Sequence, residues 1–242
     1  MPSVQIVFDT TSQELKVGVP ISLEFHLEEN GKSITELVPL HEKLAHLIVI
    51  REGLDQFSHL HPKVGTDGAM NVLATFPMPG NYFLYADFQP KNRSALLAKA
   101  RVTVAGPSFA AAPLLPNAKP EVIVEDLKTH VTIDAMRNES TITFQIRDST
   151  AQPVTDLQAY LGAMGHLVVV SADGQEYVHA HPIEDAPAAS KGIVAFGAHL
   201  KAPGIYKLWG QFQRRNEIVT IPFVVEYRSK ESDNSQPAHA DH

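Results

Sequence analysis

Six of the 12 histidines occur in two copies of one spaced pattern. Segment 46–62 reads HLIVIREGLDQFSHLHP and segment 166–182 reads HLVVVSADGQEYVHAHP, and three of their six identical positions are histidine. Three neutral imidazoles that converge on one point suit copper, zinc, nickel or iron, and do not suit magnesium or calcium. The pattern therefore predicts two transition-metal sites with these ligands: His46, His59 and His61 in the first copy, and His166, His179 and His181 in the second.

A β-hairpin would place the three histidines of each copy on one face. Asp173-Gly174 is a strong signal for a two-residue hairpin turn. A turn centred on this pair sets His166 opposite His181, and Val168 opposite His179. Directly opposed residues share a face of the sheet, as do residues two apart on one strand. The three imidazoles should therefore project together, and the offset of 120 transfers this register to the first copy.

Two neighbouring residues distinguish the copies. Met164 precedes His166 by two positions, where the first copy has Leu44. A thioether is a soft ligand, so Met164 is a candidate fourth ligand that would favour copper, especially Cu(I), at the second site. His41, whose counterpart is Leu161, is a further candidate beside the first site only.

Short segments of alternating apolar residues must position these histidines. Such segments lie at 21–27, 46–50, 81–88, 141–146 and 166–170, and several are rich in β-branched residues. This pattern is typical of strands, and many short strands need a second sheet to cover their apolar face. We therefore expect an all-β protein with two tandem immunoglobulin-like or cupredoxin-like β-sandwich domains.

The duplication extends beyond the histidines and gives the domain boundaries. PGNYFLYADFQ at 79–89 matches PGIYKLWGQFQ at 203–213, at an offset of 124. AGPSFAAAPLLPNAKP contains four prolines and should form a stiff spacer. The predicted organisation is a first sandwich at 1–104, a linker at 105–120, a second sandwich at 121–228 and a disordered polar tail at 229–242.

Composition excludes several classes of function. Of the 242 residues 44% are hydrophobic and 19% are charged, which is typical of a soluble globular protein. The net charge of −7 argues against nucleic-acid binding, and no apolar run is long enough to span a membrane. The chain has no cysteine, which excludes disulfides, thiolate nucleophiles and cysteine metal sites. Residues 1–8 do not read as a secretion signal, so we expect a cytoplasmic protein as written, or a periplasmic or extracellular one if the chain is a trimmed mature form.

The second copy resembles a known group of domains. GHLVVVSADGQEYVHAHP followed by APGIYKLWGQFQ is similar to bacterial immunoglobulin-like or cupredoxin-like domains of the YtkA/FixH-like type. The resemblance covers about half of each repeat and is clearest at 165–213. It implies a β-sandwich associated with heavy-metal and copper handling, usually exported, and it implies no reaction. The first copy departs from the pattern at Ala45, where the second has Gly165. The matching residues are His166, His179, His181, Pro182, Pro203, Gly204 and Tyr206.

Three functions remain open from the sequence. We expect a carrier, buffer or sensor, rather than a catalyst, that binds one copper or zinc ion per domain and exchanges it with a metal-donor or metal-acceptor protein. The second interpretation is a bicupin-like dioxygenase or isomerase, because Gly53 and the following His59-Leu60-His61 resemble the first cupin motif; no glutamate follows at the expected distance. The third is a metal-free adhesive or scaffold sandwich. The oligomeric state is not set by the sequence.

Overall fold

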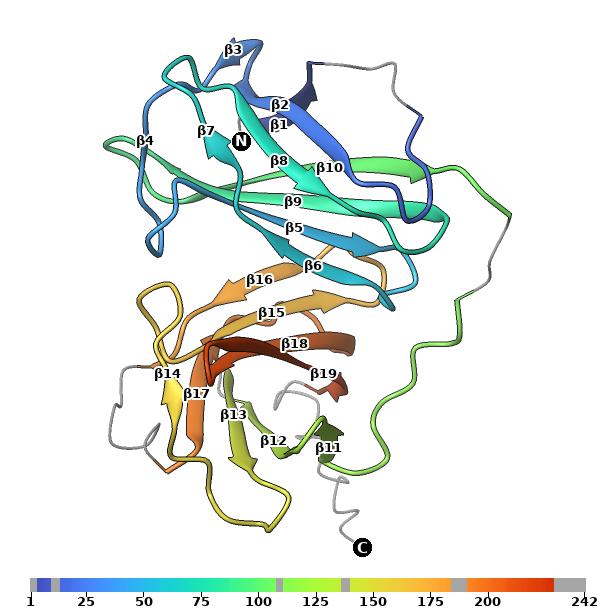
Figure 1. The fold of residues 1–242 in the computed structure, drawn as a ribbon, viewed down its shortest axis with the longest axis vertical. Coiled ribbons are helices and arrows are strands. Elements are labelled where there is room, and N and C mark those ends of the chain that lie inside the picture. Colours follow the sequence, from blue (N-terminus) through green and yellow to red (C-terminus); the bar gives the residue numbers. More distant parts are fainter. Residues whose placement is uncertain (1–3, 10–13, 108–110, 136–139, 184–190, 229–242) are drawn as a thin grey trace, which may run out of the picture. The chain divides into compact units, whose positions relative to one another are not determined.

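The computed structural model describes residues 4–9, 14–107, 111–135, 140–183 and 191–228 (Figure 1). The chain divides into two compact units, Met1–Pro113 and Leu114–His242, called unit 1 and unit 2 below. The boundary lies inside the segment predicted as a linker, and the predicted tail at 229–242 lies outside the described residues. The described residues form strands and no helix, so none of them forms a helix able to span a membrane.

The strands carry the labels of Figure 1. Those of unit 1 are β1 (Val4–Phe8), β2 (Ile21–Glu29), β3 (Lys32–Ser33), β4 (Leu37–Val38), β5 (Ala45–Arg51), β6 (Phe57–Leu60), β7 (Lys63–Val64), β8 (Met70–Ala74), β9 (Gly80–Pro90) and β10 (Leu96–Val104). Those of unit 2 are β11 (Glu121–Val124), β12 (Leu127–Ala135), β13 (Ser140–Arg147), β14 (Leu157–Gln158), β15 (His166–Ser171), β16 (Tyr177–Ala180), β17 (Ile193–Ala198), β18 (Gly204–Arg214) and β19 (Glu217–Tyr227).

Unit 1 is a sandwich whose two layers are joined through β1. The hydrogen-bonded order is β6-β5-β9-β10-β1-β2-β8-β7, with β3 beside β2 and β4 beside β9. Strand β1 runs antiparallel to β2 and meets β10 in one parallel pair. Alternate side chains of β5 and β9, such as Leu47 and Leu84, point into a core shared with Phe25 and Val72 from β2 and β8. This alternation confirms the predicted strand pattern.

Unit 2 is a sandwich of two separate sheets. One sheet has the order β11-β12-β13-β17, and the other has β14-β18-β15-β16 with β19 paired to β18. Phe144 and Phe196 from the first sheet meet Phe212 from the second, with ring centroids 5.3 to 6.3 Å apart. Leu167 and Val169 of β15 join the same core. The predicted second sandwich is therefore confirmed.

Both units contain the same tyrosine contact at the start of a central strand. The Tyr82 hydroxyl donates a hydrogen bond to the Met78 carbonyl at 2.8 Å, and the Tyr206 hydroxyl makes the matching bond to Ala202, also at 2.8 Å. A tyrosine that bonds back to the backbone a few residues upstream is a feature of immunoglobulin-like sandwiches. Together with the sheet orders, it confirms two tandem immunoglobulin-like domains.

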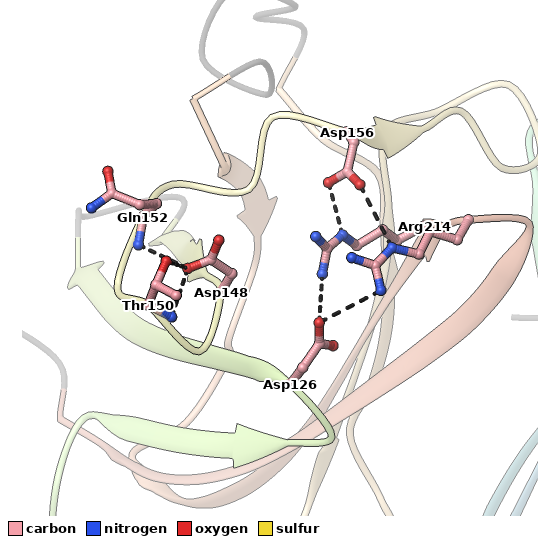
Figure 2. A network of polar contacts seen from close by, with 7 residues as sticks. Asp126, Asp148, Thr150, Gln152, Asp156 and Arg214 are labelled. Atoms are coloured by element: carbon pink, nitrogen blue, oxygen red, sulfur yellow. Dashed lines mark hydrogen bonds and ion pairs between the residues drawn. The ribbon is translucent and has the colours of Figure 1, made fainter.

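An ion-pair network around Arg214 holds the segment that leads into β14 (Figure 2). The Arg214 Nε donates to Asp156 at 2.7 Å, and its terminal nitrogen donates to Asp126 at 3.0 Å. The Arg214 hydrogen bond holds the pKa of Asp156 below its ordinary value. Asp126 lies in the turn between β11 and β12, while Asp156 directly precedes β14. The network therefore anchors the chain shortly before the turn at 160–163 described below.

Candidate metal centres

The two histidine hairpins have the predicted register. In unit 1, Ile48 of β5 lies opposite His59 of β6. In unit 2, Val168 of β15 lies opposite His179 of β16. The offset of 120 between the copies is thus preserved in space, and the histidines of each hairpin share one face of the sheet.

The turn of the second hairpin differs from the prediction. The Ser171 N–H donates to the Glu176 carbonyl and the Gly174 N–H donates to the Ser171 carbonyl, so the loop comprises the four residues 172–175. Gly174 has a φ of 71° and closes this longer loop rather than forming the centre of a two-residue turn. The register is unchanged because a four-residue and a two-residue loop with the same centre pair the same residues.

Each unit brings its three predicted histidines together. Ring centroids lie 4.7 to 5.2 Å apart in the first group and 4.7 to 5.8 Å apart in the second. In each group, one nitrogen from every ring lies within 4.8 Å of the others. Tetrahedral bonds of about 2.05 Å require nitrogens roughly 3.3 Å apart, so no pair of these nitrogens would need to approach by more than about 1.5 Å. We call these groups the first triad (His46, His59, His61) and the second triad (His166, His179, His181).

Backbone carbonyls fix which nitrogen of the central histidines can bind an ion. The Nε2 of His46 lies 2.9 Å from the Leu40 carbonyl oxygen, and the Nε2 of His166 lies 2.8 Å from that of Tyr160. A carbonyl only accepts hydrogen bonds, so each Nε2 carries the proton and each Nδ1 offers a lone pair. In the first triad this Nδ1 lies 2.9 Å from the Nε2 of His59. Metal-binding imidazoles commonly donate their other N–H to such a carbonyl.

Two tight turns that the sequence analysis missed supply these carbonyls. Residues 40–43 and 160–163 each close with reciprocal backbone hydrogen bonds. Both central residues of each turn have a positive φ, between 50° and 74°, as in a type I′ turn. Gly162 was the one sequence signal for such a turn, and a backbone carbonyl carries no signal of its own. His41 lies in the first turn, with its ring centroid 6.3 Å from that of His46.

The central histidines are buried, and the surroundings of His46 favour its neutral state. His46 and His166 are 0% exposed, while the other four histidines of the triads are half-buried. Burial lowers the pKa of His46, although its hydrogen bond to Leu40 opposes the shift. Neutral imidazole is the form that binds a metal ion, so this environment keeps His46 ready to act as a ligand.

The surroundings of the two triads differ. Asp87 of β9 lies directly opposite His46, whereas Gln211 of β18 lies opposite His166. Met164 is half-buried and packs against the core of unit 2. Its predicted role as a ligand to the second site stays a prediction.

One family model matches most of the chain. The model, described as a domain of unknown function (DUF8832), matches residues 4–106 and 124–229. The chain belongs to the DUF8832 family. Since the two matched segments correspond to the two predicted copies, the DUF8832 domain is duplicated here and the predicted internal repeat is confirmed.

Comparison with other proteins adds similarities to solved structures only. No curated protein matches the chain. A tetra-tandem repeat from the extending region of a large adhesion protein is 13% identical, with a TM-score of 0.31, 95% of this chain covered and 50% of that one. The Escherichia coli adhesin FdeC is 15% identical, with a TM-score of 0.29 and coverages of 92% and 63%. A two-domain fibronectin type III segment of chicken tenascin is 9% identical, with a TM-score of 0.26 and coverages of 93% and 99%. The chain thus spans about half the length of the first of these structures.

Proposed function

We propose that the protein binds a copper or zinc ion at each triad and acts as a metal carrier, buffer or sensor. The observation that carries this proposal is the repeated arrangement of three imidazoles whose central member has its Nε2 proton held by a backbone carbonyl. Packing of a half-buried sheet face does not require three histidines at matching positions in both units.

The ligand set favours exchange over permanent storage. Three protein nitrogens leave one position of a tetrahedral ion for water or another ligand, as in zinc sites that are not purely structural. An open position lets a donor or acceptor protein bind the ion before the histidines release it. We therefore propose such a metal-exchanging protein as the partner.

The resemblance of residues 165–213 to YtkA/FixH-like domains supports copper as the ion and an exported location. The immunoglobulin-like fold is not the jelly roll that the bicupin-like interpretation requires. Among the described residues, the two candidate ligand groups contain only histidine and no glutamate. We therefore propose a binding function and no reaction.

Elemental analysis of protein purified without a histidine tag tests the proposal. After equilibration with copper or zinc and removal of free metal, we expect one ion per triad. A variant carrying both His59→Ala and His179→Ala is the matched control and should retain no stoichiometric metal. Equal, negligible loading of both proteins would support the metal-free adhesive function instead. Iron or manganese together with oxygenase activity would support the cupin-like one.

A further inference from the structure

The residue that faces the central histidine carries a charge in unit 1 and none in unit 2. Asp87 is paired with His46 across β5 and β9, and Gln211 is paired with His166 across β15 and β18. Side chains directly opposed in an antiparallel pair share a face, with Cβ atoms about 4.5–5.5 Å apart. Each of these two side chains therefore lies beside its triad.

Asp87 influences the first triad through its charge and not as a ligand. The candidate ligand group in unit 1 contains three histidines and, among the described residues, no carboxylate. The Asp87 charge nevertheless acts on His46 and on His41, where it opposes the lowering of the pKa by burial. His41 and Lys43 act on the pKa of His46 in the opposite direction, and each acts more weakly than Asp87. Asp87 therefore contributes a field at the first triad that favours positive charge.

Gln211 places no charge at the corresponding position beside the second triad. Its side chain is buried, and its Nε2 donates a hydrogen bond to the Thr220 hydroxyl at 3.2 Å. The position that corresponds to Lys43 is Ala163, so the opposing cation is absent there as well. The positions that hold Asp87 and Lys43 in unit 1 therefore hold an amide and a methyl group, both uncharged, in unit 2.

We propose that Asp87 is a specificity-determining residue that makes the first triad select divalent over monovalent ions, whereas Gln211 leaves the second triad without this selection. The inference rests on the proposed function, since it concerns ions bound at the triads. It assigns Zn²⁺ or Cu²⁺ to the first triad and makes the second the better site for Cu⁺.

The size of the effect follows from Coulomb's law. A carboxylate about 7 Å from an ion, at an effective dielectric constant of about 40, changes the affinity about 7-fold for each charge on the ion. A divalent ion gains the square of this factor, about 50-fold, because it carries twice the charge. The ratio of divalent to monovalent affinity should therefore change about 7-fold when the carboxylate is removed.

Isosteric substitutions in single-site backgrounds test the proposal. His179→Ala leaves the first triad intact, and His59→Ala leaves the second. Zn²⁺ and Cu⁺ affinities are measured in each by competition with chromophoric chelators, without oxygen for Cu⁺. We expect Asp87→Asn to lower the Zn²⁺/Cu⁺ affinity ratio of the first triad about 7-fold, and Gln211→Glu to raise that of the second by a similar factor.

Three controls distinguish an effect of the Asp87 charge from a structural effect of the substitution. Asp67→Asn removes the same charge from an exposed turn between β7 and β8 and should leave the ratio unchanged. Asp87→Glu keeps the charge and should keep most of the selectivity. The effect of Asp87→Asn should also shrink as salt rises from about 0.05 to 0.5 M, which a purely structural role would not predict.

The outcomes distinguish a failure of this inference from a failure of the proposed metal-binding function. If both single-site parents bind Zn²⁺ and Cu⁺ but Asp87→Asn leaves the Zn²⁺/Cu⁺ affinity ratio of the first triad unchanged, the inference is wrong. An equal loss of both ions in Asp87→Asn would also overturn it, since it would indicate a positioning role. Parents that bind neither ion would instead contradict the proposed metal-binding function.

Discussion

Replacing one histidine of one triad should empty that triad alone. His179→Ala leaves His166 and His181, whose ring centroids lie 4.7 Å apart, as the remaining ligands of unit 2. Structural zinc sites with four ligands release about 10–16 kcal/mol on binding, or roughly 3 kcal/mol per ligand. Loss of one imidazole should therefore raise the dissociation constant of the second triad by about two powers of ten or more. The first triad draws its ligands from unit 1 only, so its affinity should not change.

The single tryptophan of the chain offers a readout for the second triad. Val168 of β15 is paired with Trp209 of β18 on one side and with His179 of β16 on the other. Trp209 and His179 therefore share a face, two strand spacings or about 10 Å apart. Bound Cu²⁺ at this distance should quench the indole fluorescence. We expect His179→Ala to abolish quenching by the first two equivalents of Cu²⁺, which fill both triads of the unsubstituted protein, and His59→Ala to preserve quenching by the first equivalent.

Elemental analysis of the same variants completes the assay. Each should lose one of the two bound ions, and His199→Ala, at an exposed histidine of unit 2 outside the triad, should lose neither. Loss of both ions from either single substitution would refute the reasoning, because it would mean one shared site. Unchanged loading in His179→Ala would equally refute it.

Three further predictions concern ligand identity, pH and the anchoring network. Met164→Leu is nearly volume-conserving and should cost under about 1.5 kcal/mol of stability, yet weaken Cu⁺ at the second triad alone; an unchanged Cu⁺ affinity would mean that Met164 only packs in the core. Metal loading, measured by equilibrium dialysis, should fall as pH drops through about 6.5 because protons compete for imidazole nitrogens, with His46 protonated late because burial lowers its pKa. Insensitivity between about pH 7.5 and 5.5 would point to carboxylate ligands. Arg214→Gln should destabilise unit 2 at pH 7 by at most about 1 kcal/mol, since Asp156 is half exposed. The Arg214 hydrogen bond lowers the pKa of Asp156, so this stabilisation is present above the unfolded pKa of about 4 and should be lost as pH falls from there through the lower folded pKa; a pH-independent difference in denaturant unfolding would contradict this.

The sequence by itself determined the fold class and the histidine groups. Alternation of apolar residues has the period of a strand, and the two copies constrain one another, so the pairing of Val168 with His179 could be derived from the position of the turn alone. The exact loop was predicted wrongly because the Asp173-Gly174 signal fits both a two-residue and a four-residue hairpin. The error had no effect on the triads, since both loops have the same centre.

Tertiary structure decided what surrounds the triads. The carbonyls of Leu40 and Tyr160 fix the proton on Nε2 of the central histidines, and backbone groups are the same for every residue type. Asp87 reaches His46 only through the pairing of β5 with β9, which are separated by several strands and loops in sequence. Local periodicity specifies which side of a strand a residue occupies, but it does not specify which distant strand lies beside it. The candidate ligands could therefore be predicted from the sequence, whereas the groups that set their tautomer and electric field could be identified only from the tertiary structure.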